Sequence, residues 1–104
     1  MKKDNQFKQY QTTARSLENG RTEVVYYKTL IVAFDKEEIV LDAGGWRTRT
    51  TMIRMNQVSR HFGLGYRVYQ KDTQWFVEYK KEKHNFTDDQ VRLDRTSGEV
   101  TAAS

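Results

Sequence analysis

The sequence predicts a single α+β domain in which an antiparallel sheet of about five strands packs on one central helix. The first observation is a set of short segments rich in β-branched and aromatic residues, which are typical of strands. The second is one amphipathic segment of helical periodicity, residues 48–62, with strand-like segments on both sides of it. The third is the length of 104 residues, which suits one domain. The predicted element order is β-β-β-α-β-β.

Three strands are predicted before the helix, at Thr22–Tyr27, Thr29–Phe34 and Glu38–Asp42. In the second, Leu30, Val32 and Phe34 alternate with other apolar residues, so both faces are apolar and the strand should be central or covered on both sides. A polar turn separates the second strand from the third. Two glycines, Gly44 and Gly45, should end the third strand because glycine tolerates positive φ.

The helix is predicted over Thr48–Phe62. Thr48 or Thr50 can cap its N-terminus, and Gly63 stands where a C-terminal glycine belongs. At about 100° per residue, one arc of the helix is suited to packing on the sheet. This core arc contains Met52, Met55, Val58, Ser59 and Phe62.

After the helix, Tyr66–Gln70 and Gln74–Lys80 are predicted to form a hairpin, and a short edge strand is predicted within Phe86–Leu93. The ends of the chain are polar. We therefore expect residues 1–21 to be a flexible basic arm, residues 22–95 to form the domain and residues 96–104 to be a frayed tail.

Composition excludes several classes of protein. The chain has no cysteine, which removes disulfide scaffolds, cysteine-ligated zinc and thiol catalysis. No apolar run approaches the roughly 20 residues of a membrane span, and no secretory leader is visible, so a cytoplasmic protein without membrane contact is expected. His61 and His84 lie in separate segments, and no phosphate-binding loop, dinucleotide motif or serine elbow occurs. We expect neither an enzyme nor a metal or cofactor site.

The positive charge is concentrated in one stretch. Residues 46–71 carry six basic side chains and no acidic one, although the whole chain has a net charge of +4. Five of the six are arginine, which is suited to bidentate contacts with phosphate or carboxylate. The stretch predicts a surface for nucleic acid or for an acidic protein. The alternative is that acids from elsewhere in the fold, such as Glu37, Glu38 or Asp42, neutralise it.

The predicted outer face of the helix carries a second pattern. Arg49, Ile53 and Arg60 fall within an arc of about 40°, with Asn56 and Gln57 on either side. Arginine, asparagine and glutamine contact guanine and adenine edges, and an apolar residue among them can touch a thymine methyl. The alternative is that Ile53 packs beneath the N-terminal arm or a loop.

Aromatic residues alternate with basic ones on both sides of the helix, in Trp46-Arg47, Tyr66–Lys71 and Trp75–Lys81. Such neighbours can track a single strand while its bases stack, although aromatic residues are also ordinary strand residues. Trp46 follows two glycines, where a ring can be presented rather than buried. The candidate binding residues are Trp46, Arg47, Arg49, Ile53, Arg54, Asn56, Gln57, Arg60 and Arg67.

The segment from Leu41 to Thr51, which reads LDAGGWRTRTT and continues to Arg54-Met55-Asn56, resembles a stretch of small bacteriophage accessory proteins. In these a strand ends in Gly-Gly-aromatic, a Thr-Thr pair follows, and a helix with an Arg-hydrophobic-Asn segment comes next. The resemblance covers roughly residues 24–79 and carries no catalytic residues. It implies a phage accessory protein acting in an infected bacterial cell.

We therefore expect a small basic accessory protein that binds nucleic acid, DNA or RNA, through an arginine-rich helix face. A second hypothesis is a protein-binding inhibitor of a host defence machine, such as a restriction or CRISPR effector with an acidic surface. In that case Ile53 and Trp46 become the apolar anchors. A third is a self-associating structural component. The sequence leaves the oligomeric state open.

Overall fold

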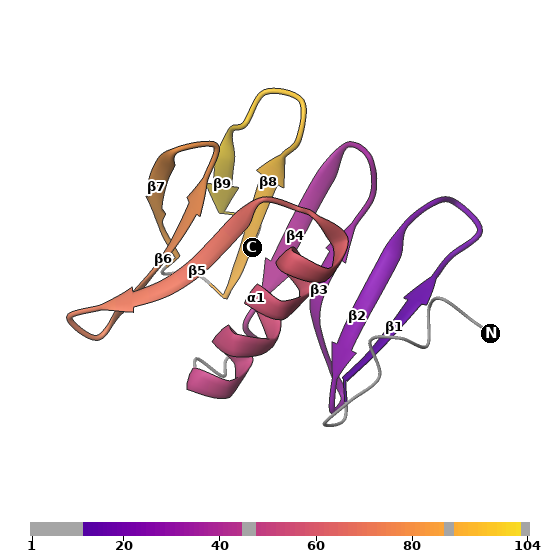
Figure 1. The fold of residues 1–104 in the computed structure, drawn as a ribbon, viewed down its shortest axis with the longest axis horizontal. Helices are drawn as coiled ribbons and strands as arrows, with labels where there is room; N and C mark the ends of the chain where they lie inside the picture. Colours follow the sequence, from indigo (N-terminus) through magenta and orange to yellow (C-terminus); the bar gives the residue numbers. More distant parts are fainter. Residues whose placement is uncertain (1–11, 45–47, 87–88, 103–104) are drawn as a thin grey trace.

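The computed structural model describes residues 12–44, 48–86 and 89–102. Within these ranges the chain forms one helix and nine strands in two antiparallel sheets (Figure 1). The larger sheet has the order β1-β2-β3-β4-β8-β9 and the smaller has the order β5-β6-β7. The elements are β1 Thr12–Ser16, β2 Thr22–Tyr26, β3 Thr29–Phe34, β4 Glu38–Asp42, α1 Arg49–Phe62, β5 Tyr66–Lys71, β6 Gln74–Tyr79, β7 Glu82–Asn85, β8 Gln90–Asp94 and β9 Val100–Ala102.

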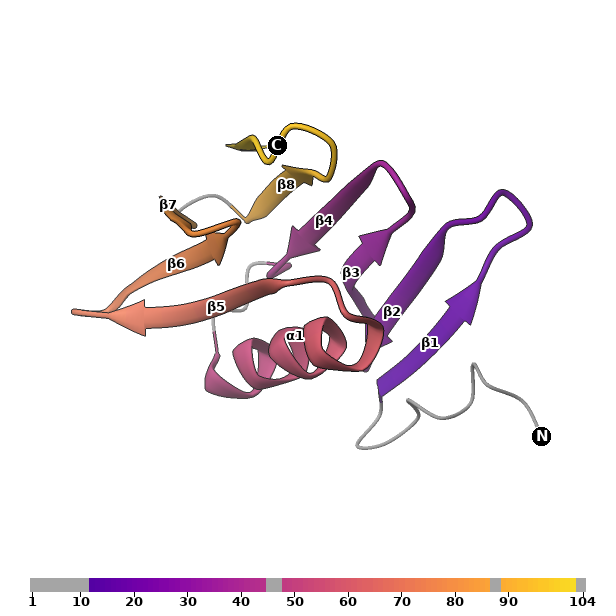
Figure 2. The same cartoon turned by 45° about the horizontal axis from the view of Figure 1, so that its top comes forward.

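Helix α1 lies against one face of the larger sheet, and β5 of the smaller sheet runs beside it (Figure 2). The packing contacts of α1 are with β2 and β3 on one side and with β5 on the other. The core between these elements includes Val24 and Ile31 from the larger sheet, Met55 from the helix, and Val68 and Val77 from the smaller sheet. Burying these apolar side chains is the main force that holds the layers together.

The predicted helix and its boundaries are confirmed. Thr48 is the N-cap, and its side chain accepts a hydrogen bond from the backbone N–H of Thr51. Gly63 ends the helix at φ 66°, a left-handed conformation that glycine adopts without a steric penalty. Met55, Val58 and Ser59 are buried, and the other two members of the core arc, Met52 and Phe62, pack partly buried against the core.

The predicted strands at 29–34 and 38–42 coincide with β3 and β4, and the hairpin after the helix forms as β5 and β6. The α+β class is also confirmed, but the single sheet of about five strands is wrong, because the described residues form nine strands in two sheets. Helix α1 lies between the two sheets, so strands on either side of it in sequence do not need to share one sheet.

Three strands form where none was predicted. Strand β1 lies in the stretch expected to be a flexible arm, and β9 lies in the expected frayed tail. Strand β7 follows β6 directly. Because β9 pairs with β8, the strand predicted as an edge is an interior strand between β4 and β9. These polar segments are ordered by backbone pairing with an existing sheet, which local hydrophobicity does not reveal.

The predicted alternation of β3 is interrupted. The pairing register between β2 and β3 shifts between Val24 and Val25, so that Val24 pairs with Val32 and Val25 with Leu30. As a result Ile31, Val32 and Ala33 are all buried, whereas Leu30 is 37% exposed. An extra residue in one strand moves the following side chains to the opposite face. The prediction that Leu30 and Val32 point the same way is therefore wrong.

Candidate nucleic-acid interface

Arg49, Ile53 and Arg60 are all exposed on α1, as the helical arc predicted, and Thr50 and His61 are exposed beside them. Both arginines are exposed, and Ile53 is 41% exposed. Among the residues that the structure describes, Arg49 and Arg60 form no ion pair. Within the described ranges, the helix therefore presents two positive charges without an ion-pair partner and an exposed apolar side chain between them.

Asn56 has a different role from the one the sequence suggested. Its Nδ2 donates to the backbone carbonyl of Val68 over 2.8 Å, and its Oδ1 accepts from the backbone N–H of Val68 over 2.8 Å. The amide is part-buried, and both its nitrogen and its oxygen form a hydrogen bond with the backbone of β5. We therefore leave Asn56 out of the candidate interface.

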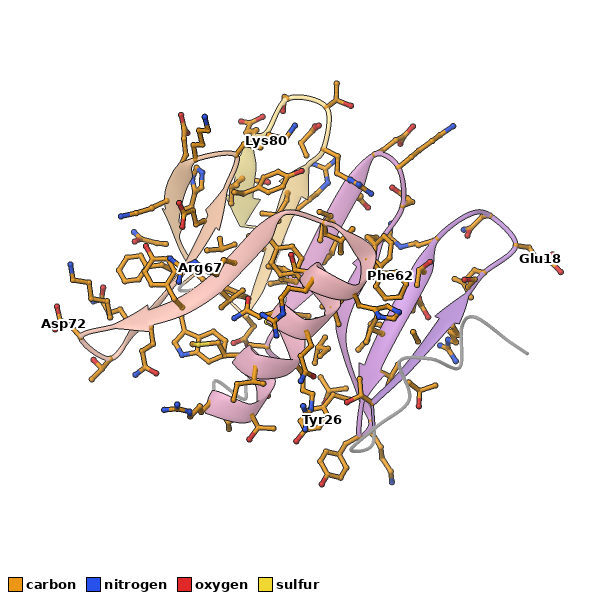
Figure 3. All side chains as sticks on the ribbon, viewed as in Figure 1. Glu18, Tyr26, Phe62, Arg67, Asp72 and Lys80 are labelled. Atoms are coloured by element: carbon orange, nitrogen blue, oxygen red, sulfur yellow. The ribbon has the colours of Figure 1, made fainter. Side chains whose placement is uncertain are left out.

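Arg54 and Gln57 lie on a flank of the helix and are partly buried. Arg54 Nη1 donates to Gln57 Oε1 over 2.9 Å, and the Arg54 guanidinium lies 5.8 Å from the ring centroid of Tyr26 on β2. Figure 3 shows Tyr26 at the end of β2, by the turn into β3. Because both side chains are partly buried and Arg54 lies against Tyr26 of the larger sheet, they are less available to a ligand than Arg49 and Arg60.

Arg67 lies on β5, and its side chain is 61% exposed (Figure 3). Its Nη2 is 3.2 Å from Glu78 Oε1, and its guanidinium lies 4.8 Å from the ring centroid of Tyr69. A surface ion pair of this kind contributes little to stability, so the arginine can exchange Glu78 for a phosphate at small cost. Arg67 is thus paired but still accessible.

A groove of about 420 Å³ connects the end of the helix with the smaller sheet. Arg60 and Arg67 both line it, together with Lys80 and Lys81 from the turn between β6 and β7. Glu78 is the acid in its lining. Lys80 Nζ donates to the carbonyl of Arg95 over 3.0 Å, whereas Lys81 is exposed. The fold thus brings basic residues from three segments to one concave surface.

A second groove, of about 490 Å³, lies between the first turns of α1 and the β5–β6 hairpin. Arg49, Met52 and Ile53 line its helix side, and Tyr69 and Asp72 lie on the hairpin side. Figure 3 shows Asp72 at the tip of that hairpin. Each groove contains one carboxylate, but the second has more apolar residues in its lining and fewer basic ones, so it offers a mixed apolar and charged surface.

The acids that the sequence offered as neutralising partners are used elsewhere. Glu38 pairs with Arg21 over 3.1 Å and with Arg92, both outside the arginine-rich stretch. Asp42 accepts a hydrogen bond from Gln90 Nε2 over 2.9 Å and another from the backbone N–H of Gly44. Glu37 is exposed at the turn between β3 and β4. The fold therefore does not bring Glu38 or Asp42 to the helix arginines.

Trp46 and Arg47 lie outside the described residues, so their predicted contacts stay predictions. The structure joins Arg49 with Ile53 in one groove and Arg60 with Arg67 in the other. Sequence reasoning did not select Lys81, although the Tyr79-Lys80-Lys81 run was visible as a basic segment beside an aromatic residue. Lys81 and Arg60 are far apart in the sequence, so the sequence did not indicate that both line one groove.

Within the described ranges, no cluster of three or more histidine or acidic side chains is arranged to hold a metal ion. No helix in the same ranges is long and apolar enough to span a membrane. The Tyr66 hydroxyl, which lies under the helix and donates to the carbonyl of Met55 over 2.6 Å, has a pKa raised well above 10.0 by burial. It serves the packing of α1 on β5.

The described part of the chain is thus an α+β protein that presents arginines along one helix and an adjoining sheet. The chain belongs to the family described as Kyanoviridae Gp96 protein, whose family model matches residues 1–95. It is therefore a phage protein, which confirms the phage class that the resemblance implied. The comparisons with curated proteins and with solved structures give no match.

Proposed function

We propose that this phage protein binds nucleic acid through the exposed face of α1 and the basic groove beside it. The observation that carries the proposal is the pair of exposed arginines, Arg49 and Arg60, which have no ion-pair partner among the described residues. Arg67 and Lys81 extend the positive surface from the helix to the smaller sheet. Clustered arginine and lysine side chains neutralise phosphates and release counterions, which drives binding.

The test is fluorescence anisotropy with labelled single-stranded and duplex oligonucleotides at about 50 and 200 mM salt. The double variant Arg49→Ala, Arg60→Ala is expected to bind about tenfold more weakly at low salt, with a salt slope smaller by about two. The matched control is Lys28→Ala, Lys36→Ala, which removes the same charge from exposed positions in the two turns on either side of β3. Equal affinity and salt slope for the helix variant and the parent would overturn this site.

A protein partner is the second candidate, and the exposed Ile53 beside the groove of about 490 Å³ favours it. An apolar side chain with arginines around it is a common anchor in protein interfaces. Co-purification separates the two functions. A raised 260/280 absorbance ratio that falls in high salt supports nucleic acid, whereas a normal ratio with a host protein retained on the column supports the alternative.

A further inference from the structure

The outer face of the smaller sheet carries an aromatic row between basic residues. Tyr69 on β5 and Phe76 on β6 are paired across the strands, and Asn85 on β7 completes the row. The two rings stack on each other, with centroids 5.5 Å apart and an interplanar angle of 19°, so part of one face of each ring is turned toward the other ring. Both are partly exposed, whereas Val68, which precedes Tyr69, and Val77, which follows Phe76, are buried on the opposite face of the sheet.

The neighbouring rows of this face are charged. On one side Arg67, Glu78 and Lys83 are aligned across the three strands, and on the other side Lys71 pairs with Gln74. Adjacent rows on one face of a strand are about 6.6 Å apart, so cations stand on both sides of the rings at close range. Lys71 and Lys83 are exposed, and the one acid of the face, Glu78, is already paired with Arg67 over 3.2 Å.

We infer that this face, defined by Arg67, Tyr69, Lys71, Phe76, Lys83 and Asn85, is a stacking platform for the unpaired bases of a single nucleic-acid strand. The inference rests on the proposed function and specifies its substrate class. Bases stack on partly exposed aromatic rings while cations on either side neutralise the backbone. The Arg67 guanidinium lies over the Tyr69 ring, 4.8 Å from its centroid, and Asn85 is exposed at the end of the row, where its amide can meet base edges.

We expect a duplex to bind this face more weakly than a single strand, because the bases of a duplex are stacked on one another and cannot stack on the aromatic side chains. Arg67 also lines the basic groove that reaches Arg60, and Tyr69 lines the groove that contains Arg49 and Ile53, so the platform adjoins the helix surface at two residues. A strand lying on the rings can therefore continue into the groove, where its phosphates meet Arg60 and Lys81. The two surfaces act on the same ligand, one through bases and the other through phosphates.

The experiment compares three probes of about 15 nucleotides, namely oligo(dT), an abasic strand of the same length and a duplex, with oligo(U) added to separate DNA from RNA. The parent is expected to bind oligo(dT) or oligo(U) about tenfold more tightly than the abasic strand, because only the former can stack. Equal binding to the base-bearing and abasic strands would overturn the platform and leave the proposed function intact. Absence of binding to every probe would overturn the proposed function itself.

The double variant Tyr69→Leu, Phe76→Leu keeps apolar side chains on the sheet but removes both rings. It is expected to bind oligo(dT) no more tightly than the abasic strand, with the affinity for the abasic strand unchanged. The conservative pair Tyr69→Phe, Phe76→Tyr keeps the rings and should retain the preference for bases. Thermal unfolding followed by circular dichroism checks that each variant is folded. A folded leucine variant with the full preference for bases would refute the assignment.

Discussion

The side-chain amide of Asn56 on α1 pairs with both main-chain groups of Val68 on β5, each bond being 2.8 Å long. Ser59, one helical turn further on, does the same for Tyr66: its Oγ donates to the carbonyl over 2.7 Å and accepts from the N–H over 3.1 Å. Strand β5 is an edge of its sheet, so these groups have no strand beside them on that side. Side chains of α1 thus satisfy the backbone groups at the free edge of β5. Because α1 also packs on β2 and β3, it connects the two sheets.

Replacing Asn56 by alanine should destabilise the protein by about 1–3 kcal/mol, because the part-buried N–H and carbonyl of Val68 lose their partners. Urea denaturation followed by circular dichroism measures the change. Arg60→Ala, on the exposed face of the same helix, is the control and should change the free energy of unfolding by less than about 0.5 kcal/mol. Equal stabilities for the two variants would show that the amide does not hold β5 to the helix.

Gly44 should not tolerate a side chain. Its φ is +60°, and a Cβ added there would lie 2.7 Å from Cγ2 of Thr29, a β-branched residue with little freedom to move. Gly44→Ala is expected to lower the free energy of unfolding by about 1–3 kcal/mol through backbone strain and this clash. Gly20→Ala also has positive φ but meets nothing within 4 Å, so it measures the backbone part alone. The Gly44 variant should have the lower midpoint of thermal unfolding.

Acid should weaken the turn between β3 and β4. Burial raises the pKa of Asp35, but hydrogen bonds from the backbone N–H groups of Glu37 and Glu38 and the ion pair with Arg21 outweigh it, so the pKa lies below 3.8. A carboxylate with a lowered folded-state pKa stabilises the fold above its unfolded pKa, and this contribution is lost as the pH falls through the folded pKa. Stability from this site is therefore complete near neutral pH and declines below about pH 4.

Asp35→Asn tests this dependence because the asparagine oxygen can still accept both backbone hydrogen bonds while the charge is lost. The variant is expected to be less stable than the parent at pH 7, with the difference shrinking toward pH 2–3. Urea midpoints across that range give the comparison. Glu18→Gln, which removes an exposed carboxylate from the turn between β1 and β2, controls for the change in net charge. A difference that stays constant with pH would contradict the assignment.

Glu78 is the acid on the outer face of the smaller sheet, between Arg67 and Lys83. If a nucleic-acid strand lies on this face, Glu78→Gln should increase affinity by about two- to fivefold at low salt, because it releases Arg67 and removes repulsion of phosphates. The gain should shrink at high salt as the charges are screened. Anisotropy titration with oligo(dT) measures it, and Glu18→Gln is again the matched control. A loss of affinity for oligo(dT) would contradict this account, because it would mean that the ion pair with Glu78 helps Arg67 to bind the strand.

The local features were the predictable ones. Helix α1 is predictable because its periodicity, its Thr48 cap and Gly63 all lie within one segment. Strands β3 and β4 are likewise bounded by turn residues that can be recognised nearby. The exposed arc of Arg49, Ile53 and Arg60 follows from the same periodicity. The larger sheet is completed by the pairing of β4 with β8, two strands far apart in the chain, which short-range patterns do not contain. Strands β1, β7 and β9 each pair with the strand next to them in sequence, but they contain few large apolar residues, so their patterns did not predict strands.

In the candidate site too, some features follow from the local sequence and others from the tertiary structure. The sequence by itself determined which residues are basic and which of them share the exposed side of the helix, because composition and helical geometry are local properties. Only the tertiary structure decided that Asn56 bonds to Val68, that Glu38 pairs with Arg21, and that Tyr69 and Phe76 form a row beside Arg67. These relationships depend on strand register and on the docking of α1 against β5. Both are decided by how separate elements pack and pair, which the periodicity within one element does not specify.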